Sequence, residues 1–139
     1  RRWLRAGWLH DALRDAAPEV LAAEAGDPTL PANLRHGPAA ARRAAAHGET
    51  DQGVLDAVRY HSTGHPGWDA AGRALYCADF LEPGRRFDRE ARAELAKRFP
   101  ADPAGVFQAV VRWRLEHLLR AGWPIPETTW RLWNAIAAG

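Results

Sequence analysis

The chain has 139 residues, of which 47% are hydrophobic and 26% are charged, a composition typical of one globular domain and not of a disordered segment. Its single cysteine, Cys77, excludes a disulfide framework, and no apolar run approaches the ~20 residues of a membrane span, so we expect a cytoplasmic protein without a signal peptide. Nineteen basic residues against seventeen acidic ones leave a net charge of +2, so we expect no nucleic-acid or membrane partner.

Helical patterns separated by glycine, proline and capping residues follow one another along the chain. Pro18 interrupts the first pattern, so we expect two short helices there, with Asp15 as the N-cap of the second. The expected helices cover residues 3–25 (in two pieces), 34–47, 51–61, 68–81, 88–99, 103–120 and 126–136. No window alternates as a strand would, so we predict an all-α fold of about six to eight helices in one domain, residues 1–139.

Particular residues mark the expected helix ends. Gly48 is expected to close the alanine-rich helix, and Thr50 or Asp51 to cap the next one. Asp102, followed by proline, is typical of an N-cap, and Gly122 ends the longest helix. In the first helix, the pattern places Leu4, Trp8 and Leu9 on one apolar face. The tryptophans 113, 123, 130 and 133 are interpreted as core or as a C-terminal packing patch.

Two neighbouring residues, His10 and Asp11, have the chemistry of metal ligands. Adjacent side chains on a helix point about 100° apart, so they bind one ion together only if a helix end turns both inward. The alternative is a surface polar pair or an N-cap.

Three further polar residues stand where apolar neighbours predominate or where helices end. Taken singly, each has a structural interpretation: His36 as a helix cap, His61 as a core histidine, and Asp79 as an ion-pair partner of Arg73 or Arg85. Together with the His-Asp pair, they form a mixed imidazole and carboxylate set, which suits iron, manganese, zinc or nickel. Two such ions are a common device for activating water against a phosphoanhydride.

Five short segments carry a resemblance to a known family. They are residues 8–11 (WLHD), 34–38 (LRHGP), 59–64 (RYHSTG), 78–85 (ADFLEPGR) and 118–125 (LLRAGWPI). The first resembles the signature of the HD-domain phosphohydrolases. The others, in their order and spacing, are similar to the YqeK-like symmetrical diadenosine tetraphosphate hydrolases. The resemblance extends over about residues 4–134, and it implies a single HD-domain helical bundle.

The resemblance also implies a centre of two metal ions, with iron as the expected metal and manganese or another transition metal as the alternative. It assigns five ligands, with the aspartate that follows His10 bridging both ions: His10, Asp11, His36, His61 and Asp79. The implied reaction is attack of a metal-bound hydroxide on a dinucleoside polyphosphate, which gives two ADP from diadenosine tetraphosphate.

Supporting roles are assigned less directly. Arg14, three residues after Asp11, is expected to clamp a phosphate and to act in catalysis, although arginine is a poor proton donor. His65 is a candidate acid for the leaving phosphate, and the alternative is an exposed loop histidine. The remaining candidates for substrate contacts, with a helix-capping loop and solvated arginines as the alternatives, are Ser62, Thr63, Gly64, Arg85 and Arg86.

One departure from the family bears on function. HD proteins carry another ligand histidine on a helix before the His-Asp pair, whereas only nine residues precede His10 and none is histidine. We therefore expect that N-terminal helix to be missing from this chain. The alternatives to a diadenosine tetraphosphatase are an HD nucleotidase or phosphodiesterase of other specificity, and a non-catalytic nucleotide- or protein-binding domain. A homodimer is compatible with the sequence but is not required by it.

Overall fold

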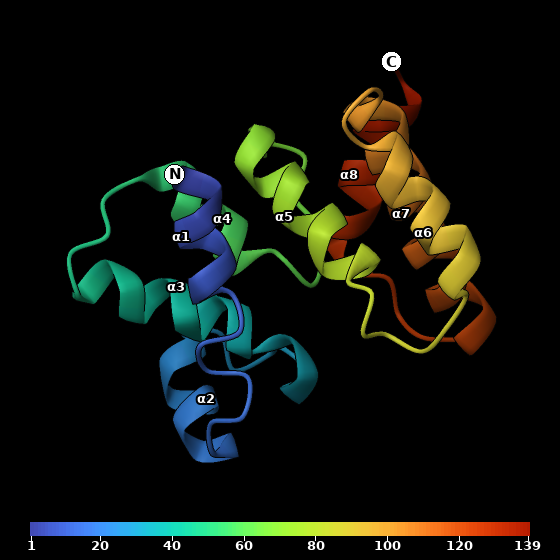
Figure 1. Ribbon diagram of the computed structural model, residues 1–139. Coiled ribbons are helices and arrows are strands. Elements are labelled where there is room, and N and C mark those ends of the chain that lie inside the picture. The colour runs from blue at the N-terminus through green and yellow to red at the C-terminus, as the bar shows by residue number, and fades with distance from the viewer. The chain divides into compact units, whose positions relative to one another are not determined.

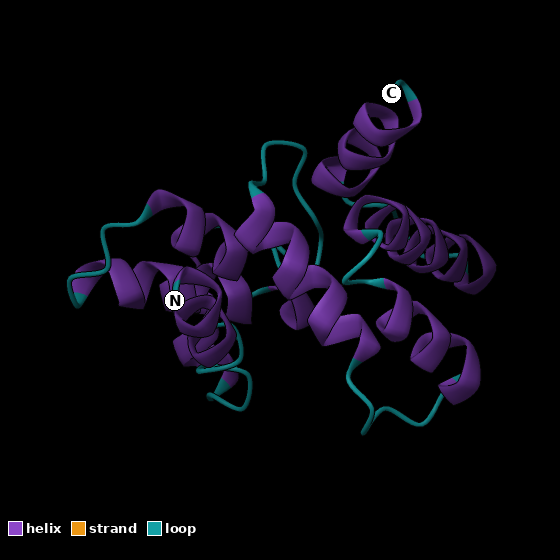
Figure 2. Cartoon of the chain, turned by 45° about the horizontal axis from the view of Figure 1, so that its top comes forward, coloured by secondary structure: helices purple, strands orange, loops and turns teal.

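The computed structural model describes residues 1–139 and consists of eight α-helices and one 3₁₀ turn, with no β-strand (Figure 2). The helices are α1 (Arg2–Leu9), α2 (Pro18–Ala25), η1 (Ala32–Leu34), α3 (His36–Ala46), α4 (Gln52–Arg59), α5 (Ala70–Leu81), α6 (Arg89–Arg98), α7 (Pro103–Ala121) and α8 (Glu127–Ala137). The predicted all-α architecture is confirmed.

The chain divides into two compact units. The first comprises Arg1–Thr63 and Trp68–Leu75, and the second comprises Gly64–Gly67 and Tyr76–Gly139. Helix α5 therefore begins in the first unit and ends in the second. That the whole chain acts as one domain stays a prediction.

In the first unit, α3 lies against α1, α2 and α4 (Figure 1). Its inward face carries only small side chains, so neighbouring helices approach its backbone closely. Val54 and Val58 of α4 are fully buried in the same core cluster as the alanines of α3. Burying each such side chain contributes roughly 1.5–3 kcal/mol of transfer free energy. The buried core residues of this unit are Ala6, Leu13, Leu21, Ala39, Ala40, Ala41, Val54, Ala57, Val58 and Leu75.

A proline sets the start of helix α2. Pro18 is its first residue, and Ala17 before it has the extended backbone that a following proline favours. The expected N-cap at Asp15 is therefore wrong, and Ala17 takes that position without a side-chain cap. By contrast, Asp51 caps α4 as one of the two predicted candidates, since its carboxylate accepts the Val54 N–H at 3.2 Å.

The N-terminal arginine Arg2 connects two helix caps. Its guanidinium bonds the carboxylate of Asp51 at 2.6 and 2.8 Å and that of Asp69 at 2.7 Å. Asp69 in turn accepts the backbone N–H of Ala71 at the start of α5. One side chain thus holds α1 against the beginnings of α4 and α5.

The second unit is built on α7, which packs against α6 and α8. Its core is aromatic: Tyr76 meets Phe107 with ring centroids 6.0 Å apart, and Phe80 meets Trp113 at 5.4 Å. Arg92 of α6 is also buried there, at 1% exposure, and its guanidinium donates to backbone carbonyls. Asp102 caps α7 by accepting the Gly105 N–H, as predicted.

The aromatic side chains differ in exposure. Trp123 and Trp130 are exposed, so they do not belong to the core, and the alternative of a C-terminal packing patch stays a prediction. Trp68, in the first unit, is buried. On α1 the predicted apolar face is buried only in part: Leu9 packs against the core, whereas Trp8 is 84% exposed, and Ala6 is the fully buried residue of the helix. No helix is both long and apolar enough to span a bilayer.

Candidate metal centre

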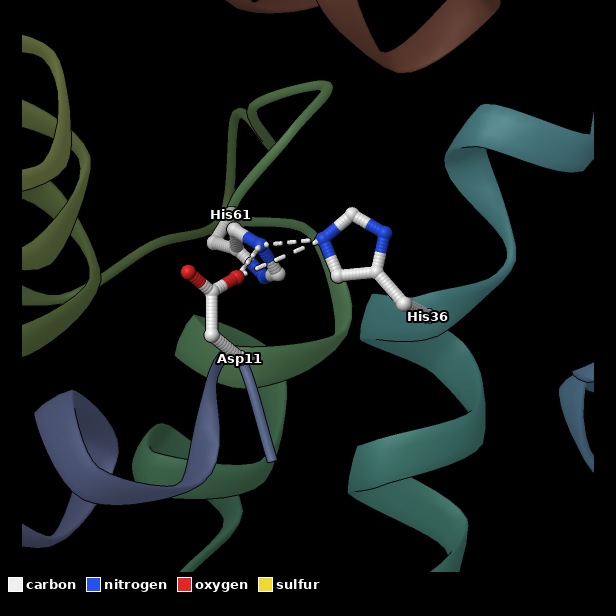
Figure 3. Close-up of side chains that lie close together, drawn as sticks. All are labelled: Asp11, His36 and His61. Atoms are coloured by element: carbon white, nitrogen blue, oxygen red, sulfur yellow. Dashed lines mark hydrogen bonds and ion pairs between the residues drawn. The ribbon is translucent and has the colours of Figure 1, made fainter. Parts of the chain in front are cut away.

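Three side chains converge in the first unit from three separate elements (Figure 3). Asp11 lies in the turn that follows α1, a turn anchored by the buried Leu13. His36 is the first residue of α3, and His61 lies two residues beyond the end of α4. Helix termini and a turn, not helix interiors, therefore aim these groups at one point.

The donor atoms form a compact triangle. The Nε2 atoms of His36 and His61 are 2.9 Å apart, and Oδ1 of Asp11 lies 3.6 Å from each of them. A point equidistant from these three atoms is ~2.0 Å from each, which matches usual zinc–nitrogen and zinc–oxygen distances. One carboxylate and two neutral imidazoles leave a single negative charge that favours a cation.

The hydrogen bond at the far side of His61 fixes its tautomer. Its Nδ1 lies 2.7 Å from the carbonyl oxygen of Val58, which only accepts, so Nδ1 carries the proton and Nε2 presents a lone pair. The ring is 2% exposed and has no room to turn away. Metal-binding histidines are usually oriented by such a bond to a backbone carbonyl. The bond fits both a metal ligand and the buried core histidine that the sequence left as the alternative.

His10 stands on the other side of the same carboxylate. Its Nδ1 donates to the carbonyl oxygen of Gly7 at 2.6 Å, so its Nε2 is likewise the atom with the lone pair. That Nε2 lies 3.4 Å from Oδ2 of Asp11, while Oδ1 faces the other two histidines. The two oxygens of Asp11 thus face different imidazoles, an arrangement compatible with a bridging carboxylate. Arg14 is 3.4 Å from Oδ2 and largely exposed.

Asp79 belongs to the second unit, where arginines hold both of its carboxylate oxygens. Arg85 donates to Oδ1 at 2.8 Å and to the Asp79 backbone carbonyl at 2.8 Å. Arg114 donates to Oδ2 at 3.1 Å and lies over the ring of Tyr76. The ion pair with Arg85 was one of the alternatives from sequence. Arg114 was missed, because nothing in the pattern of α7 distinguishes it from a solvated arginine.

The other predicted site residues lie in loops near helix ends. Ser62 and Thr63 follow the end of α4 and are half-buried. Gly64 has a left-handed backbone (φ 82°), and a Cβ there would lie 2.6 Å from Leu132. His65 accepts the Gly67 N–H on Nδ1 at 3.0 Å. Arg86 is exposed.

Cys77 and two histidines play no part in the centre. Cys77 is buried, and burial raises the pKa of its thiol to about 12, so it stays protonated and unreactive. His47 follows the last residue of α3, and His117 stacks edge-on against Trp123 with centroids 5.7 Å apart. Both histidines are exposed.

Comparisons with known proteins agree with this fold. A symmetrical bis(5'-nucleosyl)-tetraphosphatase of Bacillus subtilis is 28% identical over 92 residues, or 66% of this chain and 48% of the relative. A protein of the same name from Halalkalibacterium halodurans is 40% identical over 40 residues, or 29% of this chain and 21% of the relative. The chain thus spans at most about half the length of the curated relatives it matches. No protein-family model matches it.

A solved structure extends the likeness to almost the whole chain. It is a protein of Clostridium acetobutylicum described as a predicted HD superfamily hydrolase involved in NAD metabolism. The two structures superimpose with a TM-score of 0.82 at 24% identity, over 96% of this chain and 74% of the other. The chain therefore has the HD-domain fold. The resemblance to HD-domain phosphohydrolases that the motifs indicated is confirmed.

Proposed function

We propose that this chain is a metal-dependent phosphohydrolase that acts on dinucleoside polyphosphates and cleaves diadenosine tetraphosphate to two ADP. The observation that carries the proposal is the convergence of Asp11, His36 and His61 on a point at metal-binding distance. The fold and the name of the Bacillus subtilis relative support the hydrolase class and the substrate.

The residues that would hold metal are the three converging side chains for one ion, and His10 with the second oxygen of Asp11 for another. Nitrogen and oxygen donors of this kind suit iron, our expected metal, as well as manganese and zinc. When bound, such ions lower the pKa of water and neutralise charge on phosphate oxygens.

The chain's own residues supply orientation and charge. Val58 fixes the His61 ring through its carbonyl, and the guanidinium of Arg14 is proposed to bind a phosphate oxygen. Further substrate contacts are proposed at Ser62, Thr63, Gly64, Arg85 and Arg86, with His65 as the proton donor.

The proposed reaction consumes one water for each dinucleotide. The oxygen of water bonds to one of the two central phosphorus atoms, and the bond from that phosphorus to the bridging oxygen breaks. The bridging oxygen leaves with the second ADP and takes a proton from His65, and the proton lost by water returns to that histidine or passes to solvent.

One observation favours a second candidate, a nucleotide-binding domain without catalysis. Both oxygens of Asp79 are engaged by arginines, so this predicted ligand is already neutralised by Arg85 and Arg114. If Asp79 does not exchange these partners for a metal ion, the centre has fewer ligands than the family pattern implies.

The test is a product analysis. The chain is incubated without oxygen with Fe(II) or Mn(II) and diadenosine tetraphosphate, and nucleotides are separated by chromatography. Formation of ADP alone, lost in His61→Ala and kept in His47→Ala, supports the proposal. AMP with ATP contradicts symmetrical cleavage. Cleavage of other nucleotides alone indicates an HD enzyme of different specificity, and binding without turnover indicates the second candidate.

A further inference from the structure

We infer that Gly37 is a positioning residue for the metal centre, because the absence of a side chain there lets the beginning of α3 reach the end of α4. This inference rests on the proposed metal-binding role of His36 and His61. Gly37 itself touches neither metal nor substrate in this account.

The contact at Gly37 is made with backbone and not with flexible side chains. An ideal Cβ at this position would lie 2.7 Å from the carbonyl oxygen of Arg59 and 3.0 Å from that of Val58. Carbon–oxygen contacts between packed backbones ordinarily start near ~3.3 Å. Since both oxygens belong to the last turn of α4, a methyl group at Gly37 would have to displace that turn or α3 itself.

The displaced atoms are the ones that orient His61. The Val58 carbonyl oxygen accepts the His61 Nδ1 proton at 2.7 Å, and the same Cβ would lie 3.2 Å from that Nδ1. On the other side of the contact, His36 is the residue directly before Gly37. Both imidazoles of the 2.9 Å pair are therefore tied to one close backbone approach.

The surrounding sequence shows that a methyl group is otherwise accepted on this helix. Ala40, Ala41 and Ala44 are buried on α3 and supply its contacts with methyl groups. Glycine is less favourable than alanine in a helix, since it loses more backbone freedom on folding. A glycine in an alanine-rich helix, at a place where a Cβ would meet backbone oxygens of α4, is consistent with a requirement imposed by the site.

The experiment compares Gly37→Ala with Gly72→Ala. The second variant is a matched control, because a Cβ at Gly72 would crowd the Trp68 ring at 2.5 Å, and its three nearest atoms all belong to that ring and not to the centre. Cobalt(II) is titrated into each protein and followed by its visible absorption. We expect Gly37→Ala to bind Co(II) about 10–100-fold more weakly than the wild type, and Gly72→Ala to bind it equally well.

A metal-free readout keeps this test separate from the proposed function. Nitrogen-15 NMR of the apo chain is expected to show the His61 ring with its proton on Nδ1 in the wild type and in Gly72→Ala. In Gly37→Ala, the population of this tautomer is expected to be lower. If the wild type binds no Co(II), the proposed centre fails while the NMR comparison still decides the role of Gly37.

Unchanged Co(II) affinity together with an unchanged His61 signal in Gly37→Ala would overturn the inference. If Gly37→Ala does not fold in plain buffer, both measurements are repeated in trimethylamine N-oxide, an osmolyte that favours folded states. The variant is expected to keep the weakened affinity and the altered His61 signal there, and wild-type behaviour in both measurements would refute the role.

Discussion

The imidazole rings of His36 and His61 meet through their Nε2 atoms, which lie 2.9 Å apart although 25 residues separate them in the chain. Nδ1 of His61 donates its proton to the Val58 carbonyl, so Nε2 of His61 accepts and Nε2 of His36 is the donor in this contact. A metal ion would take the place of that single proton. The contact between the start of α3 and the end of α4 therefore brings together two of the side chains that we propose as metal ligands.

Replacing His61 is expected to abolish metal binding. His61→Ala removes one of three converging donors, and burial of its ring means that a cavity remains, so stability should also fall by about 1–3 kcal/mol. Metal per chain by elemental mass spectrometry and unfolding in urea measure the two effects. His47→Ala, an exposed histidine of the same unit, is the control and should match the wild type in both. Metal retention in His61→Ala would exclude this residue as a ligand.

Asp79 is expected to contribute to the stability of the second unit whether or not it binds metal. Its carboxylate is 15% exposed and neutralises two arginines, so Asp79→Asn should destabilise the chain by about 1–3 kcal/mol in metal-free buffer. Chelator-treated protein in a denaturant titration gives this value. Glu94→Gln, which removes an exposed partner of Lys97, should change stability by less than about 0.5 kcal/mol. Equal stability of Asp79→Asn and wild type would contradict the arginine-held state.

Stability should fall in acid because of Asp51. The hydrogen bond from Arg2 is the main cause that lowers the pKa of Asp51 to about 2. A carboxyl whose pKa is lower in the folded state stabilises the fold fully above its ordinary pKa of about 4. That contribution is lost as the pH falls from about 4 to about 2. Urea midpoints measured across this window should decline less steeply in Asp51→Asn than in the wild type, and parallel declines would contradict the assignment.

Arg92 is expected to be the most sensitive arginine of α6. Its guanidinium donates to the carbonyls of Phe80, Glu82 and Phe87 and closes the loop between α5 and α6. Arg92→Met should cost about 2–4 kcal/mol in the free energy of unfolding, because buried carbonyls lose their donors. Arg89→Met, at an exposed position of the same helix, should cost less than about 0.5 kcal/mol. Similar losses in both variants would refute the structural role of Arg92.

Much of the fold was predictable because its signals are local. Capping residues such as Asp51 and Asp102, and the proline that opens α2, place helix ends within a few residues. Asp15 failed as a cap because Pro18 sets the first helical position by itself. Trp123 and Trp130 were interpreted as core or as a packing patch, and their exposure rules out the core, because helical spacing gives a face but not what that face meets.

The site residues, too, were predictable from the sequence only in part. The motifs singled out His10, Asp11, His36 and His61, which lie together in the first unit, although their joint role as ligands stays a prediction. No sequence rule gives the Val58 carbonyl as the partner of His61, since any backbone carbonyl looks alike in a sequence. The pairing of Asp79 with Arg114 was not predictable either, because it joins residues 35 positions apart.

The most direct test of the account is the metal content of the unaltered chain, purified without chelator or a metal-binding tag and measured by elemental mass spectrometry. We predict between one and two iron or manganese ions per chain after incubation with Fe(II) or Mn(II), because one ion fits the Asp11, His36 and His61 triangle and a second fits beside His10. Essentially no bound metal after that incubation would contradict the proposed centre and, with it, the proposed hydrolysis by this chain.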